Sequence, residues 1–368
     1  MMDFLAQIIA LCKKEFLAVL KDPSSRAVLL GPVLVQALIF GYGATYDLNH
    51  APYAVLDLSH SRASTELLAK VDGNGVFERY KTLQNSTQVA STVESGEVLL
   101  VLTIPADFAD NLAAGRAAPI QMILDGRNSS TAGTAAGYMQ NIVANFNQSV
   151  AGITPTVTVV NRAWHNPNLY SRWLIMPALI VSLSLIQTLL LSALSVARER
   201  EQGTFDQLLV TPLTPMQILI GKALPAISIG LIQSSIILLI IRFWFEIPMS
   251  GSALLLYFGL FVFTCATVGI GLSISAMSSN MQQAMLYTFL IIMPLMLLSG
   301  LLTPVDNMPE VLQQITYLNP LRFGIDMVRR IYLEGADFSL VAFDFLPMIA
   351  VATVTLPLAA WLFRNRLA

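Results

Sequence analysis

Four consecutive charged residues occupy positions 198–201, and they are the part of this sequence best suited to ionic chemistry. They lie between two apolar stretches, 173–197 and 216–241, each long enough to cross a lipid bilayer. A charged side chain at a membrane centre costs about 2.5–3.5 kcal/mol on insertion scales, so this run marks where a helix leaves the membrane. The chemistry available there is pairing with opposite charges. The four residues are Arg198, Glu199, Arg200 and Glu201.

The residues that follow carry signals for the start of a helix. Gly203 interrupts the preceding helix, and Thr204 and Gln207 have capping-box spacing, which predicts a short helix over 204–210. Thr214 and Pro215 repeat the signal and start the next spanning helix. The sequence therefore predicts a short structured elbow between two membrane helices.

Catalytic patterns are missing from the sequence. The segment 220–223 contains Gly221-Lys222 but lacks the upstream glycine and the Ser/Thr of a phosphate-binding loop. We expect the Lys222 side chain to snorkel to the membrane surface. The three histidines lack metal-ligand spacing, and two serines lack the context of a nucleophile. These residues are His50, His60, His165, Ser129 and Ser130.

The composition is that of a membrane protein with a sizeable polar insert. Hydrophobic residues make up 55% of the 368 residues, charged residues 12%, and the mean hydropathy is +0.65. The net charge of −2 argues against a nucleic-acid partner. Cys12 and Cys265 both lie outside the polar insert, which excludes a disulfide or a cysteine metal site within it.

We predict a helical membrane protein with six transmembrane helices. Residues 1–26 form an amphipathic helix on the cytoplasmic membrane surface. An extracytoplasmic domain, 47–171, is inserted between the first two spans, and 172–368 form the remaining bundle. The spans are expected at 27–46, 173–197, 216–241, 252–277, 282–301 and 341–363.

The insert alternates β-rich runs with helical stretches, which predicts an α/β domain. Strands are expected near 52–58, 76–83, 97–104, 119–125 and 156–163. Helices are expected near 61–72, 86–94, 105–114 and 131–150, the third with Pro105 at its first position and Gly115 after its end.

Charge distribution predicts the orientation. An even number of spans puts both termini on the same side of the membrane. Most basic residues of the segments that flank or join the spans lie on that side, which the positive-inside rule makes cytoplasmic. Arg322, Arg329 and Arg330 depart from this rule, since they lie in the outer segment 302–340. Within 303–336 we expect two short helices, the second ending at Gly335. They either dip partway into the membrane or form a plain surface loop.

Polar residues inside the predicted spans are uncharged amides and hydroxyls, which disfavours an ion-coupled carrier. Such groups usually hold membrane helices together. The alternative is that they line a path for amphipathic or hydrophobic substrates. The candidates for this path are Gln36, Gln187, Gln233, Thr264, Thr267 and Thr288.

The stretch 197–213, AREREQGTFDQLLVTPL, resembles the signature of type-2 ABC exporter permeases, where it precedes a cytoplasmic coupling helix. The resemblance extends over essentially the whole chain. It includes Lys21-Asp22-Pro23, the segment 124–129 and Asn166-Pro167-Asn168. Within this family the chain is similar to the YbhR-like inner-membrane subunits of multidrug-type exporters.

This resemblance implies a non-catalytic permease that works with other chains. ATP and Mg would be bound by ABC ATPase subunits, so this chain itself would bind no cofactor. A second permease chain, either a copy or a sister subunit, and a periplasmic adaptor protein would complete the assembly within the lipid. Phe205, Leu208 and Leu209 lie at i, i+3 and i+4 and would anchor the coupling helix on the ATPase. The full ATPase-coupling set is Arg198, Glu199, Arg200, Glu201, Thr204, Phe205, Gln207, Leu208 and Leu209.

The first hypothesis is therefore the membrane half of an ATP-driven exporter for amphipathic or hydrophobic compounds such as drugs. It would be a multi-pass protein of a bacterial inner membrane with both termini cytoplasmic. The second is a membrane-anchored sensor or scaffold whose outer domain binds a ligand or partner. A scaffold has no need for a doubly capped cytoplasmic elbow, which favours the first hypothesis.

Overall fold

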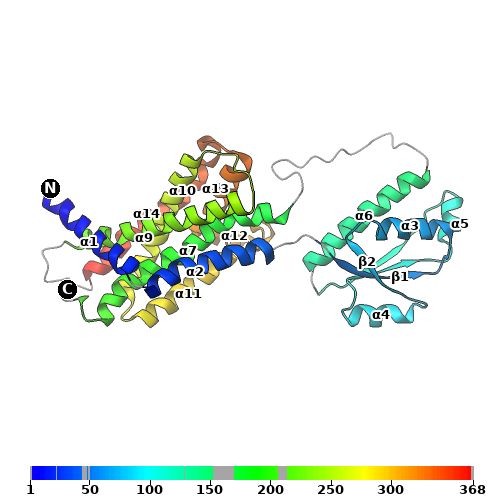
Figure 1. Ribbon diagram of the computed structural model, residues 1–368, viewed down its shortest axis with the longest axis horizontal. Coiled ribbons are helices and arrows are strands. Elements are labelled where there is room, and N and C mark those ends of the chain that lie inside the picture. Colours follow the sequence, from blue (N-terminus) through cyan, green and yellow to red (C-terminus); the bar gives the residue numbers. More distant parts are fainter. Residues whose placement is uncertain are drawn as a thin grey trace. The chain divides into compact units, whose positions relative to one another are not determined.

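The computed structural model divides into two compact units, which we describe separately (Figure 1). The sheet unit comprises Tyr46–Arg162, and the bundle unit comprises Met1–Thr45 with Ala163–Ala368. The described residues are 2–21, 23–43, 48, 50–127, 129–151, 170–205 and 214–365.

The sheet unit is built on four strands in the order β2-β1-β3-β4. β1 runs parallel to both β2 and β3, whereas β4 is antiparallel to β3. The strands are β1 (Ala51–Asp57), β2 (Phe77–Thr82), β3 (Leu100–Ile104) and β4 (Gln121–Leu124). The helices are α3 (Arg62–Asp72), α4 (Thr87–Glu94), α5 (Phe108–Ala113) and α6 (Ser129–Ala151).

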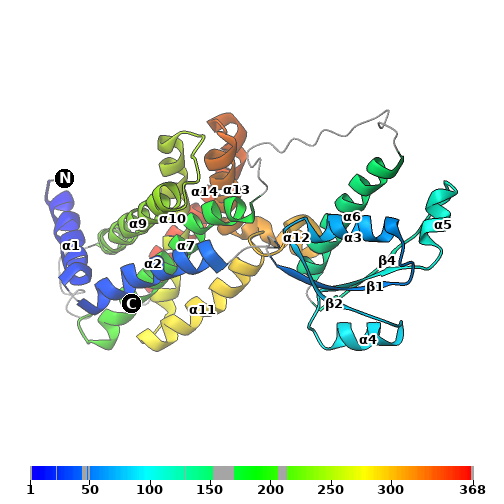
Figure 2. The same cartoon turned by 45° about the vertical axis from the view of Figure 1, so that its right-hand side comes forward.

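Both faces of this sheet are covered by helices, as Figure 2 shows with α4 on one face and α3 and α6 on the other. Successive residues of a strand point to opposite faces. Tyr53 and Val55 of β1 accordingly pack under α3 and α6, while Ala54 and Leu56 pack under α4. This two-sided burial explains why β1 reads as an unbroken apolar run.

Tyr53 also ties β1 to its neighbours through a polar contact. Its hydroxyl donates to Asp72 Oδ1 of α3 at 2.5 Å and accepts from Arg79 Nε of β2 at 3.3 Å. Burial raises the pKa of the Tyr53 hydroxyl well above its ordinary value, and the hydrogen bond to Asp72 adds to the effect. The group therefore stays a neutral donor at physiological pH.

The first four predicted strands and all four predicted helices are confirmed in the sheet unit, with boundaries that shift by up to three residues. α5 begins at Phe108, so the prediction of Pro105 at its first position is wrong. Pro105 instead opens a turn, in which its carbonyl accepts from the Phe108 amide at 3.2 Å. The predicted strand 156–163 lies outside the described residues.

The bundle unit consists of long apolar helices and several short ones. Among the described residues, four helices are long and apolar enough to cross a membrane: 171–201, 216–244, 253–277 and 338–364. This confirms a helical membrane protein. The long helices are α1 (Met2–Lys21), α2 (Pro23–Gly43), α7 (Ser171–Glu201), α9 (Pro215–Leu239), α10 (Ala253–Met277), α11 (Met281–Leu297) and α14 (Phe338–Asn365).

Helix α7 runs through the middle of this bundle (Figures 1 and 2). A glycine of α10 lets that helix approach α7 closely. A Cβ atom at Gly271 of α10 would overlap Ser192 Oγ of α7 and lie 3.0 Å from the Leu189 carbonyl oxygen. Nearby, Thr188 Oγ1 and Thr267 Oγ1 join the same two helices at 3.2 Å. Close backbone approach and hydroxyl bonding are the usual means of packing helices in lipid.

The segment before α14 forms two short helices, α12 (Glu310–Ile315) and α13 (Pro320–Arg329). Asn319 caps α13 by accepting from the Leu321 amide at 3.0 Å. A π-helical turn, Arg330–Glu334, extends α13 and ends at Gly335, whose φ of +70° suits glycine. The predicted pair of short helices and the end at Gly335 are confirmed.

Candidate functional site

The cytoplasmic elbow predicted from the sequence begins in the structure with two carboxylates and two ammonium groups that pair with one another, and the two at its centre, Glu199 and Lys222, are buried. Glu199, near the end of α7, has a side chain only 9% exposed. Its Oε1 accepts from Lys14 Nζ of α1 at 3.1 Å, and its Oε2 lies 3.0 Å from Lys222 Nζ of α9. Lys222 in turn pairs with Glu15 of α1 at 3.2 Å. We call these four residues the charge cluster.

Lys222 is the most deeply buried member of the charge cluster. Its side chain is 1% exposed, and its ammonium also donates to the Ser195 carbonyl at 3.3 Å and to Ser195 Oγ at 3.2 Å. The expectation that it snorkels to the membrane surface is therefore wrong. α1 packs over this position, and two carboxylates compensate the charge that would otherwise have to reach water.

The next two charges of the run contact two further helices. Arg200 donates to the Ala276 and Ser278 carbonyls at the end of α10, at 3.1 and 2.8 Å. Glu201 accepts from the Met281 amide at the start of α11 at 2.8 Å. A cation at a helix C-terminus and an anion at an N-terminus both match the helix dipole.

Phe205 extends the same set of contacts to the last helix. Its ring packs edge-on against Phe363 of α14 at 5.7 Å between centroids, and Arg200 lies 4.9 Å from its centre. The residue is 8% exposed and shares a small apolar core with Val196 and Ile218. Because the Phe205 side chain is packed against other parts of the same chain, little of its surface is left to contact another protein.

The structure covers part of the predicted elbow. Phe205 is helical and Thr204 is not, and Thr204 Oγ1 donates to the Glu199 carbonyl at 3.3 Å. At the far end the predicted capping box is present, with Gln217 N donating to Thr214 Oγ1 at 3.4 Å. Gln207, Leu208 and Leu209 lie outside the described residues.

The candidate path residues are mostly buried in helix contacts. The three threonines each donate to a carbonyl of their own helix, at 2.9 Å for Thr264, 3.0 Å for Thr267 and 2.7 Å for Thr288. Gln187 and Gln233 are buried as well, while Gln36 is partly exposed. Lining a substrate path stays a prediction for these residues.

Sequence reasoning missed the contribution of Lys14 and Glu15. Both lie on α1 and approach charges that follow them by 185 and 207 residues. A lysine inside an apolar run was the available signal, because a buried ammonium requires a nearby carboxylate. The sequence alone does not say which of its carboxylates this would be.

Comparison with known proteins assigns the chain to a family. Residues 24–361 match the family described as ABC-2 family transporter protein. The chain is 39% identical over 359 residues to the "Probable multidrug ABC transporter permease YbhR" of Escherichia coli, covering 97% of this chain and 98% of that one. It is also 30% identical to the "Probable multidrug ABC transporter permease YbhS" of the same organism, covering 97% and 96% of the two chains. The predicted family is confirmed, and this chain belongs to the ABC-2 transporter family.

Proposed function

We propose that this chain is the permease subunit of an ATP-binding cassette exporter, moving amphipathic or hydrophobic compounds such as drugs out of the cytoplasm or the inner membrane. Family membership supports the transporter class. The names of these relatives, multidrug ABC transporter permeases, support the compound class. The proposed assembly contains two permease chains, two ATPase chains and a periplasmic adaptor.

One observation carries the mechanism: residues 199–205 join helices of the bundle that are far apart in sequence. Glu199 links to α1 and α9, Arg200 to α10, Glu201 to α11 and Phe205 to α14. A displacement of this segment would act on all of these helices at once, because each link is a direct contact. Such direct contacts are what is required for a movement of the ATPase to change the arrangement of the helices in the bundle.

We divide the proposed coupling residues into two groups by their contacts. Glu199, Arg200, Glu201 and Phe205 hold the elbow onto the bundle. Leu208 and Leu209 are proposed to dock on the ATPase, with Arg198, Thr204 and Gln207 supporting the same short helix. The chain itself would bind neither ATP nor Mg, because both would lie on the ATPase.

The proposed topology has six spans, with α2 and α11 completing the four long apolar helices. α2 has 21 residues and α11 has 17, so both are near the length needed to cross the hydrocarbon core. Both termini and the elbow would be cytoplasmic, and the sheet unit would be periplasmic. α12 and α13 would dip partway into the membrane from the outer side.

The division of labour predicts that this chain, purified alone, does not hydrolyse ATP. Purification from native membranes under mild conditions is expected to bring along an ABC ATPase, and activity should follow that second chain through the fractions. The measurement is phosphate release by each fraction, with protein identification by mass spectrometry. Turnover by the rigorously purified single chain would contradict the proposal.

The proposed topology predicts opposite labelling of two exposed positions. In a variant whose native cysteines are replaced by alanine, a cysteine at Ser86 should react with a membrane-impermeant maleimide in intact spheroplasts. A cysteine at Gln202 should react only after lysis. Both native side chains are exposed, so access depends on the membrane alone. Equal labelling of the two positions in intact spheroplasts would refute the six-span arrangement.

A further inference from the structure

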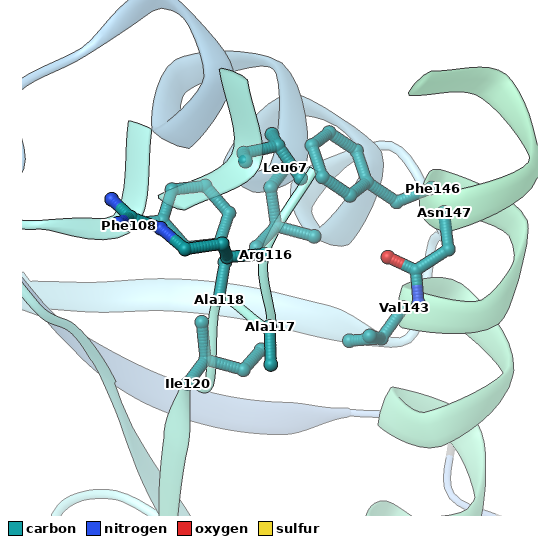
Figure 3. A pocket seen from close by; sticks show the side chains of 10 residues that line it. Leu67, Phe108, Arg116, Ala117, Ala118, Ile120, Val143, Phe146 and Asn147 are labelled. Carbon is teal, nitrogen blue, oxygen red and sulfur yellow. The ribbon is translucent and has the colours of Figure 1, made fainter. Parts of the chain in front are cut away.

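The sheet unit contains a cavity of about 290 Å³ between α3, α5, α6 and the segment that leads into β4 (Figure 3). Its apolar wall includes Leu67, Phe108 and Phe146, all almost fully buried. The two rings lie 6.4 Å apart between centroids and are nearly parallel. In Figure 3 they stand on either side of Leu67. A flat or narrow apolar group, such as an aromatic ring or an alkyl chain, fits against such a wall.

The polar groups of the cavity lie at its rim. Asn147 reaches from α6 toward the segment 116–120, and the Arg116 guanidinium lies at the Phe108 end (Figure 3). The Arg116 side chain is exposed, and the structure gives it no ion pair within the described residues. Of the described residues that line the cavity, none is acidic. The rim therefore favours a negative or hydrogen-bond-accepting group over a cation.

The size of the cavity limits what can enter. Small-molecule pockets typically measure about 300–1,000 Å³, so this one lies just below the range. It admits one aromatic ring or a short alkyl chain with a compact head group, and excludes a large polycyclic drug.

We propose that this cavity binds small amphipathic anions, with the aryl or alkyl body against Phe108 and Phe146 and the carboxylate at Arg116, at the Phe108 end. An exposed guanidinium can pair with a carboxylate in a bidentate arrangement. This ligand site goes beyond the exporter function. It can be tested by binding alone, without an ATPase or transport, so the two proposals fail separately.

The test uses the full chain in lipid nanodiscs. The two probes are phenylbutyrate and phenylbutylamine, which have apolar parts of similar size and opposite charges. Equilibrium dialysis measures bound probe, and empty nanodiscs supply the lipid background. We expect saturable phenylbutyrate binding above background and no saturable phenylbutylamine binding. Equal binding of both probes, or none above the empty nanodiscs, would overturn the proposal.

Two kinds of variant locate the binding. Arg116→Gln should weaken phenylbutyrate binding by about tenfold or more, since a hydrogen bond to a charged group is lost. Arg62→Gln is the matched control, because that exposed arginine pairs with Glu66 on α3 and does not line the cavity. It should bind as the wild type does. An unchanged affinity in Arg116→Gln would place the probe elsewhere and refute the site.

Filling the cavity gives an independent check. Val143→Phe adds a ring from the α6 wall and should remove saturable binding. If that variant fails to fold, Ala117→Leu fills the opposite wall from an exposed position, where the backbone has no reason to move. Wild-type affinity in the folded filling variant would contradict the assignment.

Discussion

Replacing Lys222 with methionine is expected to destabilise the folded bundle by about 3–5 kcal/mol and to abolish transport. The substitution keeps an apolar side chain of similar length but removes the ammonium that Glu199 and Glu15 share. Glu15 would then lose its ion-pair partner, and Glu199 would keep only Lys14, in a site from which water is largely excluded. The measurement is the thermal unfolding midpoint of the purified chain, together with export of a fluorescent amphipathic dye from cells.

Two further variants separate the charge cluster from side effects. Lys13→Met makes the same chemical change on the exposed face of α1, where we expect almost no effect. Combining Lys222→Met with Glu15→Gln should recover part of the stability, because it neutralises the carboxylate whose ion pair the first substitution removes. If Lys222→Met and Lys13→Met unfold at the same temperature, the charge cluster contributes nothing to the stability of the bundle.

The second large effect is expected at the contact between α7 and α10. Gly271→Val places a branched side chain where even a single Cβ would overlap Ser192 Oγ. Because the Leu189 carbonyl lies on the same side, the helices must move apart, and overpacking of this kind costs about 1–3 kcal/mol or more. We expect a lower unfolding midpoint and loss of export, measured as for Lys222.

The matched glycine control is Gly31→Ala on α2, where no described atom lies within 4 Å of the new Cβ. It should leave stability unchanged or raise it slightly. Ser192→Gly should restore part of the stability of Gly271→Ala, since it removes the overlapping atoms. If Gly271→Val unfolds at the wild-type midpoint, the close approach of α7 and α10 is not required.

Features set by neighbouring residues could be predicted from the sequence. The apolar run that forms β1, the capping box at Thr214 and Gln217, and the end of the outer helical segment at Gly335 each depend on a short local pattern. Such patterns determine local backbone geometry almost independently of the rest of the chain.

Features set by distant residues could not be predicted. Lys222 was expected at the surface because its sequence neighbours are apolar, and only α1 supplies the carboxylate that, with Glu199, keeps it inside. Phe205 looked like an outward anchor from its spacing, yet its partner Phe363 is on the last helix. The cavity of the sheet unit likewise depends on how α5 and α6 pack, which no short pattern encodes.

The long sequence separation within the charge cluster also sets the order in which the protein can be completed during synthesis. Glu15 leaves the ribosome 207 residues before Lys222, which corresponds to ~10–40 s at typical bacterial and eukaryotic elongation rates of about 5–20 residues per second. During that interval α1 can rest on the membrane surface with its charges in water, but it cannot dock. The nascent chain therefore closes this end of the bundle only after α9 has been made, and a chain that stalls before α9 leaves Glu15 without the ammonium that it pairs with in the finished protein.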